Sequence, residues 1–211
     1  MILQSILSCV FCLLAVFLPF ITLFLLRGPI KSFLFYFSPL FQLMFAVLAY
    51  FSYPEFYNNY ENWGWILFYC TITSATLVLL LDLIFIPIKG IRKILYKSIS
   101  NTTIEKTRLV LYLIYFITIP HLVFSLIYAF WGILSNIEVI TLFESLYFSF
   151  SLIYSLPVSR TIEEYKNIIS NENFIQLLYM IHVVISKAYE IVVLAFVASK
   201  LINYLKPTRE V

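Results

Sequence analysis

The chain has 211 residues, of which 62% are hydrophobic and only 12% are charged. Soluble domains carry roughly 25% charged residues and about half apolar ones, so this composition excludes an ordinary soluble domain. The net charge of +3 is too small to indicate direct nucleic-acid binding. We therefore predict an all-α integral membrane protein, and the heavy use of Ile, Phe, Tyr, Asn and Lys favours a bacterial inner membrane.

A membrane-spanning helix needs about 20 apolar residues, because each residue rises 1.5 Å through a hydrocarbon core of roughly 30 Å. Five segments have this length: Ile6–Leu26, Phe33–Phe51, Trp63–Ile86, Leu109–Leu134 and Phe174–Leu205. The third is expected to end at Pro87, and Pro120 is expected to bend the fourth. We divide the chain into a peripheral three-helix region (1–88), a basic cytoplasmic loop (89–108), a pore-like module (109–205) and a cytoplasmic tail (206–211).

Basic residues indicate the orientation, because Lys and Arg in short loops stay on the cytoplasmic side of a membrane. The segment 89–108 contains Lys89, Arg92, Lys93, Lys97, Lys106 and Arg108. The stretch 136–173 is mainly acidic and is expected outside, whereas the tail carries Lys206 and Arg209. Five crossings with the N-terminus outside and the C-terminus in the cytoplasm satisfy every loop. The basic loop is expected to contact anionic lipid or a cytoplasmic protein partner.

A sixth apolar stretch, Ile137–Leu156, contains Glu138 and Glu144 and is followed by Pro157. We predict a re-entrant segment that enters from outside and returns. The alternatives are an amphipathic helix on the outer surface and a sixth full span, which would export the basic tail. Re-entrant backbone is tolerated only beside protein or a water-filled cavity, so this prediction implies a pore and an oligomer.

The order of helix, pore-type segment, outer loop and last helix, over 109–205, resembles the pore module of the tetrameric potassium-channel superfamily. Residues 144–150, Glu-Ser-Leu-Tyr-Phe-Ser-Phe, are similar to the pore helix of that family. The matching positions are Glu144, Tyr147, Phe148 and Ser149. The resemblance implies that the protein assembles as a homo-tetramer.

In the same register, the selectivity filter of the family, TVGYG, falls on Ser155, Leu156, Pro157, Val158 and Ser159. These residues include no Gly. Stacked rings of carbonyl groups need backbone conformations that Gly allows and Pro restricts. We therefore expect a degenerate filter that does not select potassium.

Four polar residues, His182, Ser186, Lys187 and Glu190, interrupt the last apolar segment. A charge at the centre of a bilayer costs at least about 2.5–3.5 kcal/mol on insertion scales. His182, Ser186 and Glu190 recur at four-residue steps, and Lys187 can pair with Glu190 three residues later. One interpretation is a pore-lining face, on which the channel resemblance implies that Glu190 controls cation block. The other is an ion pair that fixes helix packing.

The sequence contains no recognisable set of catalytic residues, and its two histidines lie in separate predicted helices. We expect no enzyme activity, catalytic residue, metal or cofactor. A proton-coupled carrier could use His182, Lys187 and Glu190 as a relay, but no internal repeat supports one. We predict an oligomeric pore or ion-channel-like protein.

The main alternative is a membrane-anchored sensor or scaffold that recruits a cytoplasmic effector through the basic loop. Small membrane subunits of bacterial anti-phage defence systems, such as that of the Kiwa system, are similar to this chain in size and hydropathy. A channel should conduct alone, whereas a scaffold should not.

Overall fold

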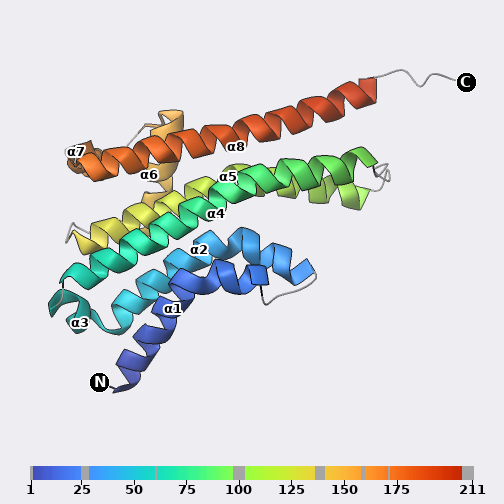
Figure 1. Cartoon of the computed structure of the whole chain (residues 1–211). Coiled ribbons are helices and arrows are strands. Elements are labelled where there is room, and N and C mark those ends of the chain that lie inside the picture. Colours follow the sequence, from blue (N-terminus) through green and yellow to red (C-terminus); the bar gives the residue numbers. More distant parts are fainter. Residues whose placement is uncertain are drawn as a thin grey trace, which may run out of the picture.

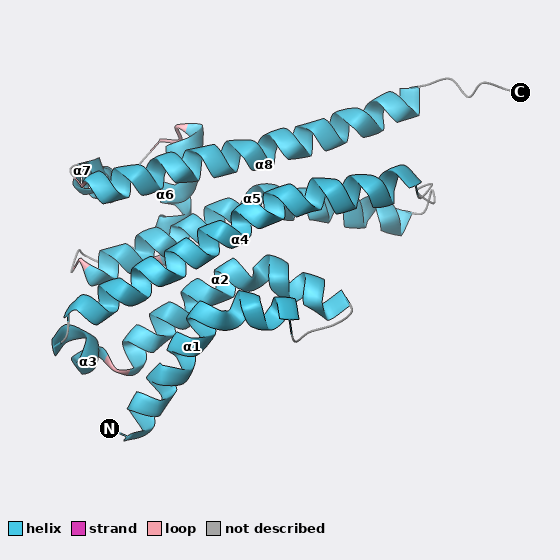
Figure 2. Ribbon diagram, viewed as in Figure 1, coloured by secondary structure: helices cyan, strands magenta, loops and turns pink. Residues whose placement is uncertain are grey.

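The computed structural model describes residues 2–24, 29–59, 61–96, 103–135, 141–157, 160–170 and 172–205. In these ranges the chain forms helices and no strand, which confirms the all-α prediction (Figure 2). The helices are α1 (Ile2–Phe24), α2 (Pro29–Ser52), α3 (Pro54–Asn59), α4 (Glu61–Tyr96), α5 (Thr103–Leu134), α6 (Leu142–Tyr154), α7 (Arg160–Ser170) and α8 (Asn173–Leu205).

The long helices α1, α2, α4, α5 and α8 run back and forth between two ends of the molecule (Figure 1). The short helices α3 and α7 lie at one of these ends, and the C-terminal end of α8 lies at the other. Helix α6 crosses α8 at a steep angle and packs mainly on α5.

Four of the described helices contain a segment that is long and apolar enough to cross a membrane. These segments are Leu3–Phe24, Asn62–Ile84, Leu113–Leu134 and Asn173–Ala195. Shorter apolar segments lie in α2, over Phe37–Ser52, and in α6, over Leu142–Tyr154. Four apolar helices of this length are characteristic of a membrane protein, which is what the composition predicts.

Prolines lie inside several of these helices without ending them. Helix α4 continues through Pro87 to Tyr96, so the prediction that this helix ends at Pro87 is wrong. The segment 89–108 is accordingly helical up to Tyr96 and again from Thr103. Membrane helices tolerate proline where other groups pair with the carbonyl that it leaves free. In α2, Pro39 cannot pair with the carbonyl of Phe35, and the hydroxyl of Ser38 donates to that carbonyl at 2.8 Å.

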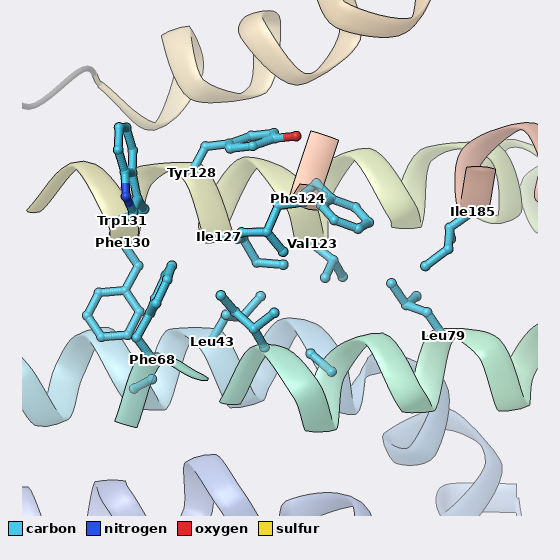
Figure 3. Close-up of a cluster of buried hydrophobic side chains, with 14 of the residues drawn as sticks. Leu43, Phe68, Leu79, Val123, Phe124, Ile127, Tyr128, Phe130, Trp131 and Ile185 are labelled. Atoms are coloured by element: carbon cyan, nitrogen blue, oxygen red, sulfur yellow. The ribbon is translucent and has the colours of Figure 1, made fainter. Parts of the chain in front are cut away.

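Among the four segments that could span a membrane, the one in α5 is the most buried, and α5 packs on α2, α4, α6 and α8. Figure 3 shows Tyr128 and Trp131 on the opposite side of α5 from Leu43 and Phe68, and all four side chains are fully buried. Phe68 and Phe130 join α4 to α5 as an edge-to-face pair with ring centroids 5.4 Å apart. Such pairs contribute about 0.5–1.5 kcal/mol beyond the burial of their area.

Helix α6 begins at a capping box. The hydroxyl of Thr141 accepts from the backbone N–H of Glu144 at 3.2 Å, and the Glu144 carboxylate accepts from the backbone N–H of Thr141 at 2.8 Å. The helix ends at Ser155, whose φ of 52° and ψ of 41° lie in the left-handed region. After this turn the chain folds back, because the hydroxyl of Tyr147 donates to the carbonyl of Pro157.

The segment predicted as an acidic outer loop contains a short amphipathic helix, α7. Its Ile162 and Tyr165 are buried, while Glu163 and Glu164 are exposed. The hydroxyl of Tyr165 donates to the carbonyl of Tyr128 at 2.6 Å. This bond anchors α7 on α5.

Candidate functional site

The polar residues of the last helix meet α5 and α6 in one cluster, which has an outward part and a buried part. In the outward part, Nζ of Lys187 lies 2.9 Å from Oε2 of Glu190. The hydroxyl of Tyr154 donates to the other oxygen of Glu190, and Nζ of Lys187 lies 5.2 Å from the centroid of the Tyr154 ring. The Lys187 and Glu190 side chains are 47% and 21% exposed, so the pair lies at the surface of the protomer.

The outward part lies on an otherwise apolar face of α8. The exposed neighbours of Lys187 on this face are Met180, Val184, Ile191 and Leu194. Lys187 is about 21 Å along the helix from its first residue, at 1.5 Å per residue, which is well inside the span that starts at Asn173. An ion pair therefore interrupts a surface that is otherwise suited to lipid.

The buried part is centred on His182, which is fully buried between α5 and α6. Its Nε2 lies 3.3 Å from Nδ1 of His121 and 3.3 Å from Oγ of Ser149. Its Nδ1 lies 3.3 Å from the hydroxyl of Tyr128. Aromatic rings cover both imidazoles, with Phe124 stacked on His182 and Phe150 stacked on His121, each at 4.3 Å between centroids. The cluster thus links the three helices α5, α6 and α8.

The four polar residues predicted on the last helix face different surroundings. His182 and Ser186 are directed into the core of the protomer, whereas Lys187 and Glu190 reach its surface. A four-residue step advances about 40° beyond one full turn at 3.6 residues per turn. Two such steps separate His182 from Glu190, so Glu190 lies about 80° around α8 from the buried side of His182 and reaches Tyr154.

Residues of the predicted pore helix and filter take several positions. Phe148 and Ser149 are buried, Tyr147 is half-buried, and Glu144 caps the first turn of α6. Ser155, Leu156 and Pro157 are exposed, while Val158 and Ser159 lie outside the described residues. The side chains of Lys89, Arg92, Lys93, Lys106 and Arg108, and all of Lys97, also lie outside the described part.

His121, Tyr128 and Tyr154 belong to the cluster but are absent from the predicted site. A histidine within an apolar helix, such as His121, is unusual enough to be noticed in the sequence. However, 61 positions separate it from His182, so the sequence does not indicate that the two rings meet. Tyr154 is one of 16 tyrosines, and its position carries no distinguishing pattern. Packing between helices that are distant in sequence brings these residues together, and the spacing of residues along the chain does not reveal such packing.

Two titratable groups outside the spanning helices, Glu144 and Tyr165, are held by hydrogen bonds. Hydrogen bonds from the backbone N–H and the hydroxyl of Thr141 hold the pKa of Glu144 below its usual value. Burial raises the pKa of Tyr165, so its hydroxyl remains a donor.

The cluster can bind and orient protons and small ions, because it combines two imidazoles, hydroxyl groups and an ion pair. Among the described residues, no group of three or more His, Cys, Asp or Glu side chains is placed to hold a metal ion. No family model, curated protein or solved structure matches this chain. Its function is therefore inferred from its own residues.

Proposed function

We propose that this protein assembles with copies of itself in a membrane and forms a pore or ion-channel-like path along the outward face of α8. The observation that carries the proposal is the half-exposed pair of Lys187 and Glu190 on an apolar face well inside the span. Contact with lipid at this depth would be costly for either charge. Water in a pore, or a neighbouring copy of α8, would remove that cost.

The proposed topology has five crossings, with the N-terminus outside and the C-terminus in the cytoplasm. The alternation of α1, α2, α4, α5 and α8 between the two ends supports it (Figure 1). Helix α6 has 13 residues and is about 20 Å long, which is too short to cross a hydrocarbon core of roughly 30 Å. Its steep crossing of α8 supports a re-entrant helix rather than a sixth span.

The proposed path does not coordinate dehydrated potassium. Helix α6 lies against α5 and α8. The carbonyl of Pro157 in the filter-equivalent segment accepts from Tyr147 of the same chain. A carbonyl used in this way is less available to replace the water around an ion. We propose a hydrated path whose selectivity is set by Lys187 and Glu190.

Single-channel currents through the purified protein in planar bilayers test this proposal. Glu190→Gln and Lys187→Gln are expected to change the conductance or rectification, because each removes one charge from the path. Glu164→Gln is the matched control, since Glu164 pairs with Arg160 at 3.2 Å on α7, which lies at the end of the molecule where α8 begins. Its currents should equal those of the wild type.

Silence of the folded oligomer under voltage, membrane tension and pH steps would contradict the pore. It would favour a scaffold that recruits a cytoplasmic partner, with 89–108 as the segment to examine. Native mass spectrometry of the same preparation would show whether the oligomer is a homo-tetramer.

A further inference from the structure

The hydrogen bonds of the buried part indicate which nitrogen of His182 carries a proton. Ser149 donates its hydroxyl proton to the carbonyl of His121 at 3.0 Å. Its oxygen therefore accepts from Nε2 of His182 at 3.3 Å, which makes this nitrogen a donor. The same N–H faces Nδ1 of His121 at 3.3 Å, so Nδ1 must offer a lone pair.

The remaining ring nitrogens follow from this assignment. Neutral His182 has its lone pair on Nδ1, which accepts from the hydroxyl of Tyr128 at 3.3 Å. Neutral His121 then carries its proton on Nε2, a buried atom with no hydrogen-bond partner among the described residues. Two neutral imidazoles thus complete the contacts that join α5, α6 and α8.

An additional proton does not fit this arrangement. A proton on Nδ1 of His121 would face the Nε2 proton of His182, and two donors would then oppose each other at 3.3 Å. A change of tautomer at His182 would relieve this conflict, but it would end the donation to Ser149. Both imidazoles are fully buried, so a positive charge there is also poorly solvated.

Tyr154 places the outward ion pair close to the histidines. Tyr154 is 39% exposed, its hydroxyl donates to Glu190, and its ring centroid lies 5.5 Å from that of His121. Tyr154 therefore lies between the outward ion pair and the histidines. Among the described residues, the titratable groups in contact with the two rings are Tyr128 on α5 and Tyr154 on α6, and the charges of Lys187 and Glu190 on α8 act on His121 from farther away.

We propose that His121 and His182 form a proton-binding link that holds α8 against α5 and α6, and that uptake of a proton by His121 releases it. Release frees the helix that carries Lys187 and Glu190, so acid conditions open the path along α8. The opening rests on the proposed function, whereas the binding of the proton does not.

Nitrogen NMR of the full chain in lipid bilayers tests the proton-binding step. Because the chain has only two histidines, labelling with ¹⁵N-histidine reports these two rings alone. At pH 7.5 both rings should be neutral with protons on Nε2. Between pH 7.5 and pH 3.5, His121 should become an imidazolium, and its contact with His182 should be lost. Two neutral rings in contact at pH 3.5, or an imidazolium at pH 7.5, would overturn the proposal.

Currents at pH 7.5 and pH 4.0 test the consequence for the path. The wild type should conduct more at pH 4.0. His121→Asn, whose side-chain oxygen can replace the Nδ1 acceptor without taking up a proton, should lose this response. Asp82→Asn removes a buried carboxyl group that lies outside the cluster. As the control, it should keep the acid response.

The two proposals can fail separately. Equal wild-type currents at both pH values, or an acid response retained in His121→Asn, would overturn the proton link and leave the pore in place. Silence of all variants together with the expected NMR titration would reject the pore and retain the proton-binding link.

Discussion

Gly132 of α5 leaves room for the anchor of α7. A Cβ at this position would lie 2.9 Å from the hydroxyl oxygen of Tyr165. That hydroxyl cannot easily move aside, because it donates to the carbonyl of Tyr128 at 2.6 Å. Gly64 of α4 differs, since a Cβ there would meet Cδ2 of Leu134, the flexible end of a side chain, at 3.0 Å.

Gly132→Ala is therefore expected to lower the midpoint of thermal unfolding in lipid nanodiscs. The loss of the α7 anchor should outweigh the gain of about 1 kcal/mol in helix propensity from Gly to Ala. Gly64→Ala is the matched control and should leave the midpoint equal or higher. A Gly132→Ala protein as stable as the Gly64→Ala protein would show that α7 does not depend on this contact.

The pair of Lys187 and Glu190 should behave as a coupled unit in stability measurements. Lys187→Met or Glu190→Met alone leaves an unpaired charge and should cost about 1–2 kcal/mol, between the values for surface and buried pairs. The double substitution should restore most of the loss, and denaturant unfolding of the four proteins measures the coupling. Additive losses would indicate that the two residues act independently.

Residue positions were predictable from the sequence where the interaction is local. Lys187 and Glu190 are three residues apart on one helix, so their pairing follows from helix geometry and is confirmed at 2.9 Å. The contact of His121 with His182 depends on how α5 packs against α8, and no local pattern encodes it. The ion pair of Lys187 and Glu190 was therefore foreseen, whereas the contacts that Tyr154 and His121 add to the cluster were not.

Among the elements, α6 has the clearest local signal, because Thr141 and Glu144 have the spacing of a capping box. The pKa of Glu144 is lowered in the folded state by hydrogen bonds from Thr141. A group with a depressed folded pKa stabilises the fold above its unfolded pKa, and this contribution is lost as the pH falls. The first turn of α6 should therefore loosen in acid.

Hydrogen exchange at the amides of Glu144 and Ser145 checks this expectation. After correction for intrinsic rates, protection should fall between about pH 5 and pH 3, around the ordinary glutamate pKa of about 4.3. In Glu144→Gln, the amide oxygen can still accept from Thr141 but does not titrate in this range, so protection should stay constant. An equal loss of protection in both proteins would assign the effect to another group.

Apolar length predicted the long helices well, but their ends less well. The third helix extends past Pro87 because proline leaves only one carbonyl unpaired and does not forbid helical backbone on both sides. Helix α7 was not predicted, since its apolar contacts come from only a few side chains, such as Ile162 and Tyr165, in an otherwise polar stretch. Short amphipathic segments become recognisable only when the surface that they cover is known.

For the whole molecule, the number of crossings decides whether the two termini lie on the same side. In the proposed topology, five crossings place the termini on opposite sides, with the N-terminus outside, whereas a sixth crossing by α6 would place them on the same side. Epitope tags at each end should therefore be labelled in opposite vesicle preparations, the N-terminal tag in right-side-out vesicles and the C-terminal tag in inside-out vesicles. Labelling of both tags from one side would contradict the re-entrant position of α6.

The central place of α5 also affects how the protein is made. Chains are synthesised from the N-terminus, so His121 and Tyr128 reach the membrane before Ser149 and His182, the residues that pair with them, have been translated. Polar groups without partners are costly in lipid. A chain that stops before α8 would thus leave Tyr128 and His121 of α5 without His182, so the polar contacts of α5 are completed only once α8 packs on it.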